Sequence, residues 1–287
     1  MQNIKDLMKD ILKNGTLKDT RTGNVISTWN KTLEWDLQKG FPTVTSKKLA
    51  WNSVVGELLW FLSGSESLKD LRIYTFGKDV DKWTIWTDDT KRWHNTNNRN
   101  LQDKDFVGAL YPVQWRNYNY SNVDQIKNIV DGLKNNPNER NHIVMAWNPE
   151  AISKNEMSLK PCHLGFQCYV ENGKLNLNWW QRSCDVFLGL CFNIASYALL
   201  QHLLASWTGL EVGKLSCWIG DTHIYENHKE AVATYLNNEE HPLPTLELPK
   251  GSETLEDVLK LTSVDFKDSL KNYVHEGPIK APLSVGK

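Results

Sequence analysis

Cys162 stands between a proline and a histidine, and its thiol is a candidate for covalent chemistry. Three interpretations are open: a nucleophile, a metal ligand, or a small apolar side chain at the head of a strand. Because free cysteine is among the most buried residue types, the local sequence alone favours the last of these. The cysteines form an odd set without CxxC spacing, which argues against a zinc knuckle or a disulfide framework, and they stand at positions 162, 168, 184, 191 and 217.

Polar side chains interrupt the apolar segment 178–197, NWWQRSCDVFLGLCFNIASY. Arginine and aspartate are rarely fully buried unless paired, so Arg182 and Asp185 could form an internal ion pair. Alternatively, Arg182 could form an anion site, because a rigid guanidinium fork suits phosphate. Asn193 opens a long apolar helix and could be its N-cap. Equally, its amide offers a donor and an acceptor that match the edge of a pyrimidine.

Glu57 lies inside the apolar run VVGELLWFL. A carboxylate there must be paired, protonated or catalytic, because the loss of water raises its pKa. His223 and Tyr225 are two residues apart, so on a strand both side chains face the same side, although such a pair is usually surface chemistry. Together, these candidates supply a nucleophile, a buried acid, an anion-binding arginine and a pyrimidine-sized polar group. The sequence has neither a GxGxxG nor a GxxxxGK phosphate loop.

The bulk properties exclude several classes of function. The net charge is −1 at pH 7 and the pI is about 6.7, so no strong field attracts nucleic acid or an anionic membrane. The N-terminal segment lacks the apolar core of a signal peptide, and the longest apolar runs are shorter than a membrane span. Cysteines without a disulfide pattern favour a reducing compartment. We therefore expect a cytoplasmic protein without membrane or nucleic-acid partners.

Helical and strand patterns are mixed along the chain, which predicts an α+β fold. Helices are expected where apolar residues recur at helical spacing, at residues 2–14, 53–64, 123–137 and 192–209. Strands are expected near 26–37 and at 142–147, 165–170 and 174–181. Residues 66–120 show no sustained periodicity and are expected to be irregular. The length suits one domain over residues 1–287, with a variable insertion around 66–108.

Eleven short motifs, in order and over nearly the whole chain, resemble the thymidylate synthase family. They are RTG, FPTVTSKK, ELLWFLSG, TIW, QWR, AWNP, PCH, QRSCDVFLGL, FNIASY, GDTHIY and IKAP. The resemblance implies an obligate homodimer in which large mixed β-sheets with flanking helices pack back to back. It also implies methylation of deoxyuridine monophosphate (dUMP) at C5 to give dTMP. The co-substrate would be 5,10-methylenetetrahydrofolate, which supplies both the one-carbon unit and the hydride, and no metal is implied.

This resemblance also implies catalytic roles. Cys162 would attack C6 of the uracil and make C5 nucleophilic. Arg182 would hold the phosphate and lie close to the sulfur, where a positive charge lowers the pKa of a thiol. Glu57 would organise water and shuttle protons, while Tyr111 and His163 would support proton removal from C5.

The other implied residues divide between the nucleotide and the folate. Asn193 would bond O4 and N3 of the uracil, and His223 and Tyr225 would bond the 3′-hydroxyl. The phosphate and its surroundings would be bound by Arg21, Gln181, Arg182, Ser183 and, from the partner subunit, Arg140. Asp185 would have a catalytic role and would also form a hydrogen bond with the pterin. The rest of the folate would contact Lys47, Ile85, Trp86, Gly189, Phe192 and Tyr273.

The sequence departs from the family pattern near the phosphate and the folate. Where the family has two arginines that reach across the dimer, this chain has Arg140 and Asn141. A charge-assisted bond contributes about 1.5–3 kcal/mol, so nucleotide binding is expected to weaken about 10- to 100-fold unless another group compensates. Asp89 stands where the family has a second folate-side tryptophan. The residues LSVGK after IKAP lengthen the tail that closes the site.

Two further functions stay open. A pyrimidine nucleotide 5-hydroxymethylase, acting on dUMP, dCMP or CMP, would use the same cysteine and folate with water in place of hydride. The outcome depends on how well water is excluded beside Trp86 and the closing tail. Asn193 favours the synthase, because relatives that use cytidine generally carry aspartate there. The third possibility is a nucleotide-binding paralogue without turnover.

Overall fold

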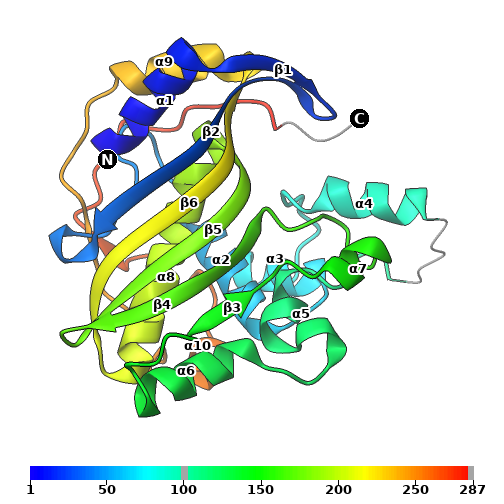
Figure 1. Ribbon diagram of the computed structural model, residues 1–287, viewed down its shortest axis with the longest axis vertical. Coiled ribbons are helices and arrows are strands. Elements are labelled where there is room, and N and C mark those ends of the chain that lie inside the picture. Colours follow the sequence, from blue (N-terminus) through cyan, green and yellow to red (C-terminus); the bar gives the residue numbers. More distant parts are fainter. Residues whose placement is uncertain (98–102, 284–287) are drawn as a thin grey trace.

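The computed structural model describes residues 1–97 and 103–283, and its central feature is a six-stranded mixed sheet (Figure 1). Its strands lie in the order β1-β2-β6-β5-β4-β3, with β5 and β6 parallel and the other neighbours antiparallel. The bounds are β1 Thr16–Thr20, β2 Gly23–Asp36, β3 Ile143–Met145, β4 His163–Glu171, β5 Lys174–Asp185 and β6 Glu211–Tyr225. A separate pair joins β7 (Thr245–Leu246) to β8 (Leu270–Lys271).

Helices α2, α3, α5 and α8 lie on one side of this sheet, and the other side faces the viewer in Figure 1. The α-helices are α1 Gln2–Asn14, α2 Trp51–Ser63, α3 Leu68–Phe76, α4 Thr87–Thr96, α5 Tyr111–Arg116, α6 Gln125–Asn135, α7 Pro149–Ser153, α8 Cys191–Thr208, α9 Lys229–Asn237 and α10 Leu255–Val258. The shorter turns are η1 Leu37–Lys39, η2 Tyr118–Tyr120, η3 Val186–Leu190 and η4 Glu226–His228.

Strand β5 shows why one side of the sheet carries the core. Buried and half-buried residues alternate along most of it, as expected for a strand with one face against helices. Leu175, Leu177 and Trp179 are at most 1% exposed and belong to the hydrophobic core. The intervening residues are half-buried and face the opposite side, which the helices leave uncovered.

Helix α8 forms the centre of the core behind the sheet. Helix α8 and the turn before it form one segment, residues 186–208. This segment is long and apolar enough to cross a membrane. However, most of this segment is buried inside the protein, which identifies it as a core helix. It links the parallel strands β5 and β6, so the sequence leaves the sheet at Asp185 and re-enters it at Glu211.

The predicted α+β fold with a large mixed sheet and flanking helices is confirmed. The expectation that residues 66–120 are irregular is wrong, because α3, α4 and α5 lie within this segment. These helices have at most ten residues each, too few for a clear period, although Leu68 and Leu71 of α3 are buried in the core. The single domain and the variable insertion around 66–108 stay predictions.

Candidate active site

Arg182, near the end of β5, is held against the loop that carries Cys162. Its Nε donates to the Pro161 carbonyl at 2.8 Å, and one terminal nitrogen donates to the Lys160 carbonyl at 3.1 Å. The same nitrogen lies 3.9 Å from Cys162 Sγ. The described partners of the Arg182 guanidinium are therefore main-chain carbonyls, and not the Asp185 carboxylate of the internal ion pair that the sequence left open.

Arg182 lowers the pKa of the Cys162 thiol, as expected, but burial outweighs this effect. Burial raises the pKa of its thiol, Arg182 opposes this effect, and the Asp89 carboxylate adds to it. The net direction is upward, so the guanidinium does not lower the pKa below its ordinary value. In the described part of the chain, no group of three or more His, Cys, Asp or Glu side chains is placed to hold a metal ion.

The remaining cysteines are free and fully buried, whereas Cys162 is only half-buried. Burial raises the pKa of Cys217 to about 12, and it raises the pKa of the other three as well. These thiols stay protonated and pack as small apolar side chains. They are Cys168, Cys184, Cys191 and Cys217.

Tyr111, the first residue of α5, holds the main chain of the Cys162 loop. Its hydroxyl oxygen accepts from the N–H of Cys162 at 2.8 Å and from the N–H of His163 at 3.1 Å. Burial raises the pKa of Tyr111 well above its ordinary value, so the phenol keeps its proton. Because both lone pairs of the oxygen are used, the O–H can act only as a donor toward the site.

The His163 imidazole is buried and neutral. Burial lowers its pKa to about 4, while a hydrogen bond with Asn193 acts in the opposite direction. Its Nδ1 lies 3.2 Å from the hydroxyl of Tyr197 on α8. Sequence reasoning missed Tyr197, because nothing in a helical apolar run marks a tyrosine as a partner of a distant histidine.

Glu57, on α2, is 7% exposed, and its Oε2 accepts from Trp86 Nε1 at 2.8 Å. Burial raises the pKa of Glu57 to about 7, although the bond from Trp86 lowers it. An acid with this pKa exchanges its proton near neutral pH, as general acid–base chemistry requires. The Trp86 ring packs at 5.7 Å from Trp60 and 5.9 Å from Tyr111, which places Glu57 close to the Cys162 loop.

Asn193 is oriented by a chain of side-chain bonds. Trp179 Nε1 donates to Gln181 Oε1 at 3.1 Å, and Gln181 Nε2 donates to Asn193 Oδ1 at 3.2 Å. This assignment leaves the Asn193 NH₂ as a donor to the site. Helix α8 begins at Cys191 with Leu190 as its N-cap, so Asn193 is not the cap.

Two residues that sequence reasoning missed hold the candidate sugar-binding pair on β6. His223 Nδ1 lies 2.8 Å from Asp221 Oδ1, and the Tyr225 hydroxyl lies 2.9 Å from that of Thr22. The bond with His223 is the largest cause of the lowered pKa of Asp221, about 2, to which Lys18 also contributes. The His223 and Tyr225 rings meet edge to face at 5.3 Å, which is consistent with their sharing one side of the strand.

Asp185 caps the turn between β5 and α8. Its Oδ1 accepts from the N–H groups of Phe187 at 2.9 Å and Leu188 at 3.3 Å, and its Oδ2 lies 3.7 Å from Nδ1 of the buried His228. Gly189 belongs to the same turn. These contacts fix the position of the Asp185 carboxylate.

The other candidate folate residues differ in exposure and in hydrogen-bond partners. Ile85 is 47% exposed beside the buried Trp86, and Phe192 is half-buried. Lys47 is buried and donates to the carbonyl of Phe187. The Tyr273 hydroxyl bonds the 44–49 loop. Residues 284–287 of the tail lie outside the described part of the chain.

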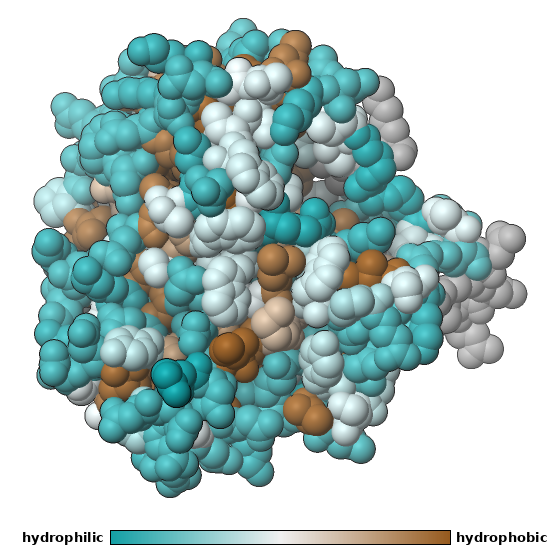
Figure 2. All heavy atoms as spheres, viewed as in Figure 1, coloured by the Kyte–Doolittle hydropathy of each residue, from teal (hydrophilic) through white to brown (hydrophobic). Residues whose placement is uncertain are grey.

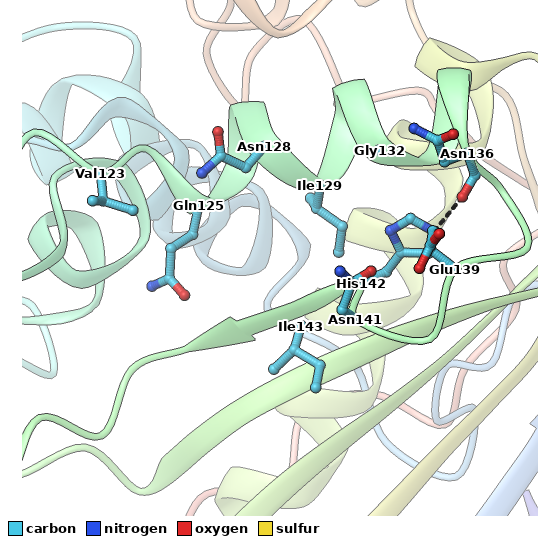
Figure 3. Close-up of a pocket in the computed structure, with 10 residues that line it drawn as sticks. All are labelled: Val123, Gln125, Asn128, Ile129, Gly132, Asn136, Glu139, Asn141, His142 and Ile143. Atoms are coloured by element: carbon cyan, nitrogen blue, oxygen red, sulfur yellow. Dashed lines mark hydrogen bonds between the residues drawn. The ribbon is translucent and has the colours of Figure 1, made fainter.

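The candidate phosphate residues separate into two places. Arg21, in the turn between β1 and β2, lines a cavity of about 430 Å³ with Arg182, and Ser183 follows Arg182 on β5. Arg140 and Asn141 do not line this cavity. Asn141 lines a different hollow, of about 570 Å³, between α6 and β3 (Figure 3).

Comparisons with known proteins agree over the full length. A family model described as thymidylate synthase matches residues 2–285. The chain is 46% identical to a probable thymidylate synthase of Escherichia phage T5, over 99% of this chain and 100% of that protein. It is 42% identical to the thymidylate synthase of Enterobacteria phage T4, over 99% and 100%. The crystal structure of thymidylate synthase from T4 phage matches with a TM-score of 0.89 and 42% identity, over 99% and 100%.

A cellular relative gives the same result, since the chain is 41% identical to a thymidylate synthase of Francisella tularensis over 99% of its length. None of these names favours a hydroxymethylase or a paralogue without turnover. The family match, the matching fold and the Cys162–Arg182 arrangement lead to one assignment. This chain belongs to the thymidylate synthase family.

Proposed function

We propose that this protein is a methyltransferase that converts dUMP to dTMP, with 5,10-methylenetetrahydrofolate as its co-substrate. The single observation that carries the proposal is the arrangement around Cys162, where Arg182 lies 3.9 Å from the sulfur and Tyr111 holds the main chain. Because all five cysteines are free, a reducing, cytoplasmic location is part of the proposal.

Cys162 forms the covalent bond to the substrate. The thiol proton passes to water, Sγ forms a bond to C6 of the uracil, and the electron pair of the C5–C6 double bond moves through C4 to O4, which takes up the negative charge. Since burial keeps the pKa of the thiol high, the thiolate forms only when its charge is compensated, and the Arg182 guanidinium, 3.9 Å from the sulfur, acts in that direction. The attacking group is therefore generated within the bound complex.

Proton transfers fall to Glu57 and Tyr111. Glu57, with a pKa of about 7, can give a proton toward O4 through water and take it back. Tyr111 keeps its own proton, so it orients the water that accepts the C5 proton and does not act as the base itself. The neutral His163 keeps Asn193 and Tyr197 in place.

Recognition of the nucleotide uses β5, β6 and the start of α8. The Asn193 NH₂ donates to O4 and its Oδ1 accepts from N3–H, a pattern that fits uracil and opposes cytosine. The phosphate is bound by Arg21, Arg182 and Ser183, and the 3′-hydroxyl by His223 and Tyr225. When bound, the folate supplies the one-carbon unit and the hydride, and its site is formed by Ile85, Trp86, Asp185, Gly189, Phe192 and Tyr273. Lys47 must leave the Phe187 carbonyl to reach the folate's glutamate.

A homodimer is part of the proposal. The uncovered side of the sheet carries apolar and aromatic side chains, which appear brown and white across the middle of this face (Figure 2). Among the sheet strands, Trp29 is 68% exposed and Tyr169 is 55% exposed, and Trp29 packs edge-on against Trp218 at 6.2 Å. Exposed aromatic surface of this kind suits an interface between two copies. Because Arg140 lies outside the cavity of its own chain, it would serve the partner's site.

Mixing two inactive variants tests the shared site. In a heterodimer of Arg140→Ala and Cys162→Ser chains, one site is doubly damaged and the other is intact. Random pairing therefore predicts about a quarter of wild-type activity at low dUMP concentration, from two preparations that are nearly inactive alone. As the control, Arg140→Ala is mixed with the double variant, which creates no intact site. Activity no greater than the sum of the separate preparations would contradict the exchange of Arg140.

The product of the reaction tests the function itself. The protein is incubated with dUMP and 5,10-methylenetetrahydrofolate, and the product is weighed by mass spectrometry. We expect the nucleotide to gain CH₂ and dihydrofolate absorbance to appear in equal amount. A gain of CH₂O without dihydrofolate would identify a hydroxymethylase instead. No product, together with no covalent complex with 5-fluorodeoxyuridylate and folate, would identify a paralogue without turnover.

A further inference from the structure

His228 is the last residue of η4, directly before α9, and its side chain is fully buried. Nε2 of its ring lies 2.7 Å from the main-chain carbonyl of Pro282 in the C-terminal tail. The other ring nitrogen, Nδ1, lies 3.7 Å from Oδ2 of Asp185. One imidazole therefore stands between the tail and the carboxylate assigned above to the pterin.

The Nδ1 atom of His228 is buried and has no hydrogen-bond partner among the described residues. The Asp185 oxygen, at 3.7 Å, is too far away for a hydrogen bond. A buried polar atom without a partner is unfavourable, so folding alone gives weak reason for this arrangement. Both groups that face the ring are acceptors, and an imidazole that carries a proton on each nitrogen serves both.

Aromatic side chains hold the His228 ring in this orientation. It meets the Phe187 ring at 5.7 Å and the Tyr225 ring at 5.3 Å. Phe187 belongs to the turn that Asp185 caps, and its N–H donates to Asp185 Oδ1. A shift of the His228 ring would therefore change its contacts with this turn as well as its distance from the carboxylate.

The tail makes one described hydrogen bond beyond Gly277. Up to that point its main chain bonds the 45–48 loop, at 3.0 Å and 2.6 Å. From 278 to 283, the bond of the Pro282 carbonyl with His228 is the only one among the described hydrogen bonds. His228 is thus the polar anchor of the last described part of the tail.

We propose that His228 is a positioning residue that couples the place of the C-terminal tail to the Asp185 carboxylate. While Nε2 donates to the tail, the ring is fixed and Nδ1 faces Asp185; when the tail leaves, the ring and the carboxylate lose this constraint. Because it is fully buried, His228 acts through Asp185 and does not contact the ligands itself. The inference rests on the proposed function only in taking a reduced folate as the ligand of Asp185.

Hydrogen exchange of the tail, followed in the peptide 274–283, tests the coupling without ligand or turnover. Asp185→Asn removes the charge but can still accept from the N–H groups of Phe187 and Leu188, so the cap of the turn is kept. Coupling is reciprocal, so we expect this variant to exchange its tail amides about 5-fold faster than wild type. A tail unaffected by Asp185→Asn would overturn the proposal.

A double-mutant cycle shows whether His228 carries the effect. His228→Phe keeps an aromatic ring but has no nitrogen, so its tail should already exchange at the faster rate. Adding Asp185→Asn to this variant should change nothing further. Two effects that add would mean that Asp185 acts on the tail by another route, and this result would overturn the proposal.

Two conservative variants separate the bond to the tail from the contact with Asp185. The amide nitrogen of glutamine can reach the position of Nε2, whereas that of asparagine can reach the position of Nδ1. We therefore expect His228→Gln to keep slow exchange of the tail and His228→Asn to lose it. Equal exchange in the two variants would contradict the role of the Nε2 bond.

His142→Phe is the matched control. His142 is also buried, and its Nε2 lies 3.1 Å from a main-chain carbonyl, that of Asn136 (Figure 3). The substitution should lower the temperature of thermal unfolding without altering exchange of the tail. Faster exchange of the tail in this variant would mean that the tail reports only the stability of the fold, and it would overturn the proposal.

Steady-state kinetics connect the coupling to the folate. His228→Phe is expected to raise the KM for 5,10-methylenetetrahydrofolate about 10-fold while the Kd of dUMP stays near that of wild type. An unchanged KM, or an equal rise in both constants, would overturn the coupling to the folate site. His228→Gln and His228→Asn should lie between His228→Phe and wild type, because each keeps one of the two contacts.

The exchange data also separate this inference from the proposed function. A protein whose tail exchange follows this pattern but which makes no dTMP would refute the function and support the inference. Normal synthesis of dTMP with tail exchange independent of Asp185 and His228 would refute the inference alone.

Discussion

The Cys162→Ser variant is expected to keep its fold and lose at least about 1,000-fold in kcat, because a serine hydroxyl is a far weaker nucleophile than a thiolate. Binding of dUMP should survive, since the nucleotide contacts proposed above lie on other residues. Formation of dTMP and calorimetric titration measure the two effects separately. A variant that keeps more than about a tenth of the wild-type rate would refute Cys162 as the nucleophile.

Cys168→Ser provides the matched control. Cys168 lies on β4, the strand that begins directly after Cys162. It is 1% exposed and packs as a core side chain. The substitution buries a hydroxyl, so we expect it to cost about 1–3 kcal/mol in the free energy of unfolding while kcat stays within a few-fold of wild type. The two serine variants should therefore separate cleanly, one losing turnover and the other losing stability.

The Glu57→Gln variant is expected to lose about 100- to 10,000-fold in kcat, the range typical for removal of a general acid–base group. Glutamine keeps the shape of the side chain and can still accept the bond from Trp86 Nε1. The loss would therefore report the proton and not the packing. Glu57→Asp, which keeps the acid but shortens its reach, should retain more activity, and equal activity of Glu57→Gln and wild type would exclude a proton-transfer role.

The same substitution should change how stability depends on pH. Burial raises the pKa of Glu57 to about 7, above the ordinary value of 4.5, so between these values the folded protein binds more protons than the unfolded chain. Stability therefore falls as the pH rises through this interval, by about 3 kcal/mol in total. Glutamine does not ionise, so above about pH 7 Glu57→Gln should be more stable than wild type, and near about pH 4 the two should agree. Urea unfolding at both pH values measures the difference, and a constant difference would contradict the buried, protonated acid.

The sequence was most informative where elements are long. The apolar length of α8 and the alternation in β5 predict their structure directly, because each contributes several periods of its own pattern. Helices α3 and α4 were not predicted, since nine or ten residues give too few turns for a polar, aromatic-rich segment to show a period. Their helical form comes from contacts such as Leu71 with the core, which only the folded chain supplies.

Some residues of the candidate site could likewise be predicted from the sequence, and others could not. Glu57 and Arg182 stand out because their charges interrupt apolar segments. Thr22 could not be found this way, since it meets Tyr225 across 203 residues and its type is common on surfaces. The pKa of Cys162 was expected to fall because Arg182 was near, but the degree of burial that raises it is a property of the folded protein.

The parallel pairing of β5 with β6 has a consequence for how the site is encoded. Register places Ser183 opposite Asp221 and Asp185 opposite His223, and the connection between the strands carries Asn193. The proposed contacts to phosphate, base and sugar therefore come largely from one continuous stretch, residues 174–225. The residues that select the nucleotide can therefore be exchanged as one segment. A chimaera that takes residues 174–225 from a relative should acquire the substrate preference of that relative, while Cys162 still comes from the host chain.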